Sequence, residues 1–453
     1  MKAEFVNLND VKITNLRIDA SYHLSEGQKV KRIFNSCPYD LLTISEVSND
    51  IFYGNRARRV YVTKRDHGIP FLSSSDILRS DLENVKLASK KYTPNLEQMK
   101  LQKGWTLISR SGTIGNCAFA NAGHAQKLAS EDVIRLVPNN ILRQGLIYAY
   151  LASKYGHLLL TQGTFGAVIQ HIEPAFVGAL PIPTFPESFQ KEVDDLIQES
   201  ATLRETAMDS LNKAVNYFNL KYVIAESITS CFTKKLKELS FSIASYNNNL
   251  EVDSFIGQFE KNSIKLKELT SRVFAPPLFK HIYLSNDNGY PFMTGSELTK
   301  FSLRYYRWLS PKGVKDINHY IVNKGTLLLY KSGTTDGGIL GNVFIVDDKL
   351  DGCCLSDHVI RIVFNDIKMA YWTFAFLKCK GAVKMLLRLA TGTMIPFITP
   401  ERLSETLIPA PDENFEYVVS LIEKYINCNS RSKFNEEKAI TLVESEIEKW
   451  NKN

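Results

Sequence analysis

The stretch GIPFLSSSDI at residues 68–77 aligns with GYPFMTGSEL at residues 289–298, at an offset of 221 positions. Further along the chain the offset becomes 226, where SEDVIR at 130–135 aligns with SDHVIR at 356–361. The matches keep their order along the chain. The sequence therefore predicts one duplicated unit, each copy covering about half of the 453 residues.

Each copy has the pattern of a mixed domain followed by a long helix. Short runs of β-branched and aromatic residues lie between glycine-containing turns, which predicts small sheets. The segments Leu180-Pro181-Ile182-Pro183 and Ile408-Pro409-Ala410-Pro411 end the mixed domains in extended conformation. After each of them, apolar residues recur at spacings of three, four and seven, which is typical of an amphipathic helix.

These patterns predict an α+β fold with two homologous mixed α/β domains, joined by two long helices that form an antiparallel coiled-coil stalk. The expected parts are residues 1–186 for the first domain, 187–222 for the central helix, 223–411 for the second domain and 412–453 for the C-terminal helix. The alternative is that each apolar stripe packs only on its own domain. A helix of about 35 residues is roughly 50 Å long and outruns one small domain, which favours pairing.

Charge follows the same division. The formal net charge of +7 separates into +7 for residues 1–186, −4 for 187–220, +7 for 221–411 and −3 for 412–453. Two basic blocks therefore alternate with two short acidic segments. This pattern indicates a polyanion as partner of the basic domains and another kind of partner for the acidic helices.

The ordered motifs resemble those of the specificity subunits of type I restriction–modification systems, over essentially the whole chain. The resemblance lies in Leu107-Ile108-Ser109-Arg110-Ser111-Gly112-Thr113-Ile114-Gly115, in Gly163-Thr164 and Gly392-Thr393 before the two proline segments, and in the opening Arg17-Ile18-Asp19-Ala20-Ser21-Tyr22. The second copy departs from the first at 332–338, where a longer glycine-rich loop replaces Thr-Ile-Gly.

The resemblance implies two target-recognition domains, each reading half of a split, asymmetric double-stranded DNA site. It also implies that the helices act as a ruler and as the docking surface for two methyltransferase subunits, which restriction or translocase subunits could join. The chain itself is expected to hold no cofactor, because S-adenosylmethionine belongs on the partner methyltransferase subunits.

Basic and hydroxyl-bearing residues in turns are the candidates for DNA contact. Arginine and lysine can bind guanine or phosphate, and the serine turns can offer hydroxyl and backbone N–H groups to phosphates. The open alternatives are solvated surface arginines, serines that only form turns, and tyrosines that belong to the core. The candidates are Arg56, Arg58, Arg59, Lys64, Arg65, Ser74, Ser75, Arg110 and Ser111 in the first copy, and Lys280, Ser296, Arg304, Tyr306, Arg307, Lys331 and Ser332 in the second.

Catalytic and metal-binding motifs are missing from the sequence, so we expect a subunit that is not an enzyme. The only Pro-Pro pair, Pro276-Pro277, lacks the polar and aromatic neighbours of an adenine methyltransferase motif, and no glycine-rich cofactor loop occurs. The eight histidines have no metal-ligand spacing. The alternatives are a self-sufficient DNA methyltransferase or nuclease with degenerate motifs, and a protein–protein scaffold.

The sequence also predicts the compartment. No stretch approaches eighteen consecutive apolar residues, and the first residues, Met1-Lys2-Ala3-Glu4-Phe5, form no hydrophobic signal core. The seven cysteines include no Cys-x-x-Cys pair, which argues against a disulfide framework or a zinc ribbon. We therefore expect a cytoplasmic protein.

Overall fold

The computed structural model describes residues 26–54, 56, 58–162, 171–225, 231–285, 288–302, 307–333, 338–392 and 394–450. The chain forms two compact units, and each consists of a mixed domain and parts of both long helices. Unit 1 comprises residues 1–205 and 432–453, and unit 2 comprises residues 206–431. Each unit is described by itself.

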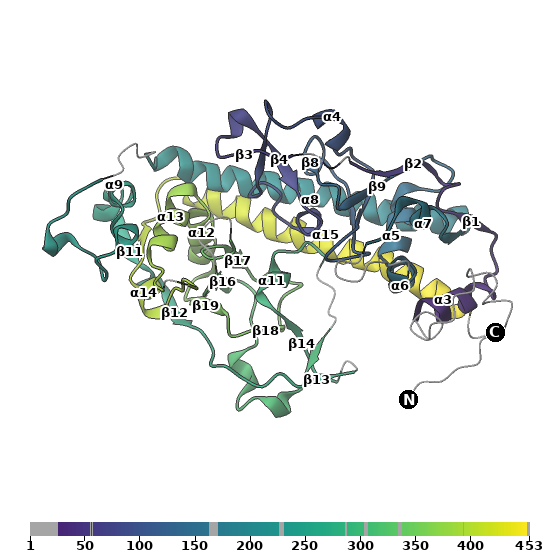
Figure 1. Ribbon diagram of the computed structural model, residues 1–453. Helices are drawn as coiled ribbons and strands as arrows, with labels where there is room; N and C mark the ends of the chain where they lie inside the picture. Colours follow the sequence, from purple (N-terminus) through teal and green to yellow (C-terminus); the bar gives the residue numbers. More distant parts are fainter. Residues whose placement is uncertain are drawn as a thin grey trace. The chain divides into compact units, whose positions relative to one another are not determined.

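Unit 1 contains short strands and helices (Figure 1), and its buried apolar side chains form three clusters. Its strands are β1 (Leu41–Thr43), β2 (Ser48–Tyr53), β3 (Tyr61–Val62), β4 (Gly68–Leu72), β5 (Leu87–Ser89), β6 (Thr106–Ser109), β7 (Cys117–Phe119), β8 (Leu128–Ala129), β9 (Val133–Pro138) and β10 (Pro181–Pro183). Its helices are α3 (Glu26–Phe34), α4 (Leu96–Met99), α5 (Gln144–Ala152), α6 (Lys154–Gln162) and α7 (Pro174–Gly178), with 3-10 turns η1 (Arg65–His67) and η2 (Asp76–Leu78).

Unit 2 repeats this arrangement with its own loops. Its strands are β11 (Ser263–Lys265), β12 (Thr270–Phe274), β13 (Tyr283–Leu284), β14 (Tyr290–Met293), β15 (Trp308–Leu309), β16 (Leu327–Tyr330), β17 (Val343–Ile345), β18 (Cys354–Leu355), β19 (Val359–Phe364) and β20 (Leu407–Pro409). Its helices are α9 (Leu250–Gly257), α10 (Leu266–Leu269), α11 (Gly295–Leu298), α12 (Ile367–Leu377), α13 (Lys380–Arg388) and α14 (Pro400–Ser404). Its 3-10 turns are η3 (Leu236–Glu238), η4 (Ser245–Asn248), η5 (Glu260–Asn262), η6 (Pro311–Gly313) and η7 (Ile317–His319).

The sheets confirm the internal repeat strand by strand. The order β2-β9-β6-β7 in unit 1 corresponds to β12-β19-β16-β17 in unit 2, and β3-β5-β4-β8 corresponds to β13-β15-β14-β18. The pairs β4·β8 and β14·β18 are parallel, whereas every other strand pair in these four sheets is antiparallel. The proline segments form β10 and β20, each antiparallel to the first strand of its unit. The predicted α+β class is therefore confirmed.

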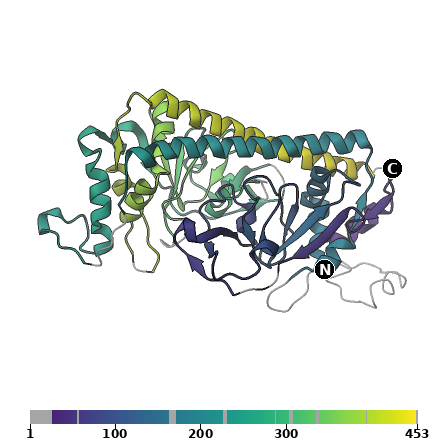
Figure 2. The same cartoon turned by 90° about the horizontal axis from the view of Figure 1, so that it is seen from above.

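The two long helices are α8 (Glu187–Lys221) and α15 (Phe415–Lys449), each 35 residues long. In unit 1 the start of α8 packs on the end of α15, where Ser200 and Ser432 exchange side-chain-to-carbonyl hydrogen bonds of 2.8 and 2.6 Å. In unit 2 the end of α8 packs on the start of α15, where Ala214 and Phe218 share a core with Val418. The α8 and α15 segments of each unit therefore run antiparallel to each other, as Figure 2 shows.

The helices bury their stripes on the domains as well as on each other, so the alternative that each stripe packs only on its own domain is wrong. In unit 1, Val193 and Ile197 of α8 belong to the same buried cluster as Leu146 of α5. In unit 2, the Phe218 ring lies 4.7 Å from the Trp372 ring of α12, centroid to centroid. Among the described residues, no helix is both long and apolar enough to cross a bilayer.

A buried arginine organises the central sheet of each unit. Arg135 on β9 and Arg361 on β19 are almost completely inaccessible to solvent, and both donate only to backbone carbonyls. Arg135 binds the carbonyls of Ser130 and Ala129 at 3.0 and 2.6 Å, and Arg361 binds those of Ser356 and Leu355 at 2.9 and 2.7 Å. Burial lowers the pKa of each guanidinium to about 10, so both are charged at neutral pH.

Replacing Arg361 by methionine should destabilise unit 2 by about 3 kcal/mol, because several buried carbonyls would be left without their charged donor. Urea unfolding followed by tryptophan fluorescence measures the effect. The matched control is Lys315→Met, since Lys315 is exposed and its replacement should change stability by less than about 0.5 kcal/mol. An Arg361→Met protein as stable as this control would contradict the structural role of the guanidinium.

Candidate nucleic-acid interface

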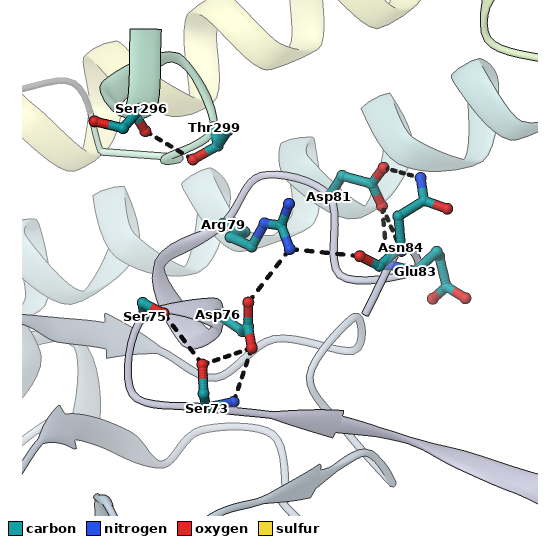
Figure 3. Close-up of polar contacts among 9 residues, drawn as sticks. All are labelled: Ser73, Ser75, Asp76, Arg79, Asp81, Glu83, Asn84, Ser296 and Thr299. Atoms are coloured by element: carbon teal, nitrogen blue, oxygen red, sulfur yellow. Dashed lines mark hydrogen bonds and ion pairs between the residues drawn. The ribbon is translucent and has the colours of Figure 1, made fainter. Parts of the chain in front are cut away.

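Ser74 and Ser75, two of the predicted serines of unit 1, lie in a tight turn between β4 and η2, which we call the capping turn (residues 73–76). The Ser73 hydroxyl and backbone N–H both donate to the Asp76 carboxylate, at 2.6 and 3.0 Å (Figure 3). The Ser75 hydroxyl is 3.1 Å from that of Ser73, and Ser75 is exposed. The backbone N–H groups of Ser74 and Ser75 have no hydrogen-bond acceptor among the described residues.

Unit 2 builds the same turn at residues 294–297. The Thr294 hydroxyl and backbone N–H donate to the Glu297 carboxylate at 2.8 and 2.7 Å, and the Ser296 hydroxyl is 3.2 Å from that of Thr294. This reciprocal pattern is a capping box, in which the residue before a short helix forms hydrogen bonds with the acidic residue three positions later. Ser75 and Ser296 therefore occupy equivalent, exposed positions in the two copies.

The capping turn is tied to the end of the central strand in each unit. The Ser109 hydroxyl at the end of β6 donates to the Ser74 carbonyl at 2.8 Å. In unit 2 the equivalent bond runs from the Tyr330 hydroxyl, at the end of β16, to the carbonyl of Gly295. A Cβ atom at Gly295 would lie 2.4 Å from the Tyr330 ring, so glycine is required beside tyrosine.

A basic residue follows each of these strand ends and is held by two backbone hydrogen bonds. Arg110 N–H donates to the Asp132 carbonyl at 2.8 Å, and the Arg110 carbonyl accepts from Ile172 N–H at 3.3 Å. Lys331 makes the equivalent bonds with the His358 carbonyl, at 2.9 Å, and with Ile398 N–H, at 2.8 Å. We call each assembly of capping turn, strand end and flanking backbone a turn cluster.

The predicted cations of unit 1 are mostly paired with carboxylates of the same unit. Arg59 forms an ion pair with Glu131, and the exposed Arg56 lies 3.9 Å from the same carboxylate. The Arg110 guanidinium is 2.5 Å from Glu173 and stacks 4.4 Å from the Tyr53 ring centroid. Ser111, the next residue, is buried. These guanidinium groups are therefore oriented, and their charge is partly neutralised.

Arg65 belongs to a second group of charges, around Glu83. Glu83 accepts from Arg65 and from Lys127, both at 2.7 Å. Burial alone would raise the pKa of Glu83, but the hydrogen bonds from Lys127 and Arg65 outweigh burial and hold that pKa below its ordinary range. Arg58 and Lys64, in contrast, are exposed and make no ion pair with the described residues.

Unit 2 presents fewer predicted cations in the described part of the chain. Arg307 is 2.6 Å from Glu297 and lies over the Phe292 ring, which places it at the capping turn. Lys331 and Ser332 lie at the strand end, and Lys280 is exposed on another loop. Neither lysine forms an ion pair with a described residue. Arg304 and Tyr306 lie outside the described residues.

His124 supports the capping turn of unit 1, a role that the sequence analysis missed. Its Nε2 is hydrogen-bonded to the Ile77 carbonyl at 3.1 Å, and its Nδ1 lies 2.9 Å from the side-chain oxygen of Asn121. Burial and the nearby charge of Arg204 lower the pKa of His124 to about 3, so the ring is neutral at neutral pH. Arg204 also donates to the carbonyl of Arg79, at 2.7 Å.

The sequence of the second repeat matches a known domain family. Residues 258–442 match the type I restriction modification DNA specificity domain. This match confirms the predicted resemblance for the second repeat, and it includes the whole turn cluster of unit 2. Among curated proteins, none matches the chain. Within the described ranges, no group of three or more histidine, cysteine or acidic side chains is placed to hold a metal ion.

Solved structures similar to the chain include three from type I systems. The S subunit from M. genitalium is 13% identical, with 92% of this chain and 96% of that chain covered and a TM-score of 0.32. The HsdS subunit from Thermoanaerobacter tengcongensis is 12% identical, with 91% and 96% covered and a TM-score of 0.28. A third structure, described as showing the structural basis underlying complex assembly and conformational transition of the type I R-M system, is 14% identical. The alignment covers 92% of this chain and 97% of that chain, with a TM-score of 0.29.

The stability of unit 1 should fall as the pH drops from about 6.5 towards 3. In that range the unfolded chain binds a proton at His124, whereas the folded side chain stays neutral, so protonation favours unfolding. Urea unfolding at about pH 7.5 and about pH 5 measures the difference. His124→Gln should reduce this pH dependence, and His67→Gln, at an exposed histidine, should preserve it. An equal pH dependence in all three proteins would refute the assignment.

Proposed function

We propose that this chain is the non-catalytic, DNA-binding specificity subunit of a type I restriction–modification complex. Each unit reads one half of a split, asymmetric duplex site, and two methyltransferase subunits, which carry S-adenosylmethionine, dock on the long helices. The observation that carries the proposal is the duplicated turn cluster. Two units hold a basic residue, Arg110 or Lys331, with the same pair of backbone hydrogen bonds beside the same capping turn.

The chemistry of the turn cluster suits a DNA backbone. Phosphate oxygens accept hydrogen bonds from hydroxyls, from free backbone N–H groups and from cations, and these are the groups that Ser75, Ser296 and Lys331 provide. The match of residues 258–442 to a DNA specificity domain supports the same ligand for unit 2. The cations differ between the copies, so the two units are expected to read different half-sites.

The paired arginines and the unpaired cations are suited to different tasks. Arg110 is oriented by Glu173 and by the Tyr53 ring, and an oriented guanidinium is suited to reading a base edge. Arg58, Lys64 and Lys280 are exposed and lack an internal carboxylate among the described residues, which suits phosphate contact. In this division, the unpaired cations provide affinity for the DNA backbone and the oriented arginine provides sequence specificity.

The long helices are better suited to a protein partner than to DNA. Their solvent-facing positions include Glu192 on α8 and Glu423 on α15, which would repel phosphates. Tyr417 of α15 is also 53% exposed, and an aromatic ring beside charged groups is typical of a protein interface. The acidic faces therefore support docking of the methyltransferase subunits.

The double variant Arg58→Ala/Lys64→Ala should weaken DNA binding by the assembled complex and make that binding less sensitive to salt. Removing one phosphate contact reduces the steepness of log K against log salt by about 0.9, so removing two reduces it by about 1.8. Fluorescence anisotropy with a cognate duplex at several KCl concentrations measures the slope. The control is Lys191→Ala, at an exposed lysine of α8, which should leave the slope unchanged. Identical slopes in the wild-type complex and both variants would remove Arg58 and Lys64 from the interface.

Exchanging residues 1–186 for the corresponding domain of another specificity subunit should change one half of the methylated sequence and leave the other half intact. The reason is that each unit carries its own turn cluster and its own cations. Methylome sequencing of cells that express the chimera with the methyltransferase subunits provides the readout. If both halves changed together, the units would not read DNA independently. If the chain methylated DNA without its partners, the enzyme alternative would replace the proposal.

A further inference from the structure

Two adjacent apolar side chains project into solvent from a loop of unit 2 between α13 and α14. Met394 is 93% exposed, more than any other large apolar side chain among the described residues, and its neighbour Ile395 is 68% exposed. Single exposed apolar residues are common on protein surfaces, but two large ones together at a turn are a costly arrangement in water. The pair therefore indicates a surface that is covered by a partner.

The loop that carries this pair is fixed at its base. Thr391 and Phe397 exchange both backbone hydrogen bonds, at 2.9 and 2.8 Å. Gly392 has a φ of +105°, and a Cβ atom there would lie 2.9 Å from the Ile395 carbonyl, so the turn requires glycine. Asn247, which is buried, donates to the carbonyls of Arg388 and Ala390 at 2.6 and 2.9 Å and fixes the entry to the loop.

The base of the loop belongs to the turn cluster of unit 2. Ile398 N–H donates to the Lys331 carbonyl at 2.8 Å, and Gly333 N–H donates to the Pro396 carbonyl at 3.2 Å. Ser332 also forms a β-bridge with Phe397. The apolar tip is thus built directly onto the segment that supplies a cation and a hydroxyl for phosphate contact.

The first repeat carries a similar pair at the corresponding position. At the offset of 226, Gly166 aligns with Gly392, and Val168-Ile169 aligns with Met394-Ile395. These residues of the first repeat lie outside the described part of the chain. Their sequence shows that both copies keep two adjacent apolar residues after the glycine, whereas the surrounding cations differ.

We propose that Met394 and Ile395 form an apolar wedge that enters a groove of the duplex and unstacks a base step in the half-site read by unit 2. Apolar side chains inserted between base pairs kink DNA, and the protein recovers the cost of unstacking through additional backbone contacts. DNA is favoured over a protein partner because the base of the wedge is formed by Lys331 and Ser332. This inference rests on the proposed function, since it requires that the turn cluster faces DNA.

The test uses the complete complex with its methyltransferase subunits and a set of cognate duplexes. Each duplex carries 2-aminopurine at one position of the half-site read by unit 2, because the fluorescence of this base rises when it unstacks. The wild-type complex should raise the fluorescence at one step. The double variant Met394→Ser/Ile395→Ser should abolish the rise, and Met394→Leu should retain it. The control is Leu236→Ser/Ile243→Ser, at two exposed apolar positions of the same unit, which should leave the signal unchanged.

Each outcome decides the inference separately from the proposed function. A cognate duplex that is bound specifically without any fluorescence rise would overturn the wedge and leave the specificity role in place. An unchanged rise in the Met394→Ser/Ile395→Ser complex would do the same. If that variant instead failed to assemble with the methyltransferase subunits, the pair would be a protein-docking element and the wedge would be wrong. Absence of salt-sensitive duplex binding by the wild-type complex would overturn the proposed function itself.

Discussion

The buried arginine of each unit is the interaction on which the candidate interface depends. Arg135 and Arg361 each bring several backbone carbonyls to one charged group, in an environment where an unpaired carbonyl would be costly. Two of the carbonyls that each arginine binds, those of Ala129 and Ser130 or of Leu355 and Ser356, belong to the segment just before β9 or β19. Those same segments present the carbonyls of Asp132 and His358 to the strand ends at Arg110 and Lys331. The interior polar network therefore fixes the backbone that faces the proposed ligand.

Much of the fold could be predicted because its determinants are local or repeated. The apolar spacing after Glu187 and Phe415 defines two helices regardless of what covers them, and the repeated motifs identify equivalent turns. The order of strands in the sheets could not be read in this way, because pairing joins residues far apart in sequence. Phe71, for example, pairs in parallel with Leu128, a partner that no local pattern indicates.

The sequence predicted the residue types of the candidate site better than it predicted which charged side chains pair with each other. The sequence placed Ser75 and Ser296 in equivalent turns, and the hydrogen bonds of the two capping turns confirm that equivalence. The sequence did not show that Arg110 would meet Glu173, 63 residues away, or that Arg59 would meet Glu131. Such long-range pairs decide which cations are oriented and which are free. His124 was missed for the same reason, since its partner Ile77 is 47 residues distant.

The junction between capping turn and strand end has a consequence for how such chains can change. In unit 1 a serine reaches the carbonyl of another serine, and in unit 2 the larger Tyr330 makes the same bond only because Gly295 leaves room for its ring. Tyrosine at position 109 would meet the side chain of Ser74, and serine at position 330 would be too short to fill its site. The residue in the capping turn and the residue at the strand end must therefore change together, as Ser74 with Ser109 and Gly295 with Tyr330. Recombination between copies should be tolerated when whole units are exchanged and penalised when a crossover falls between the turn and the strand.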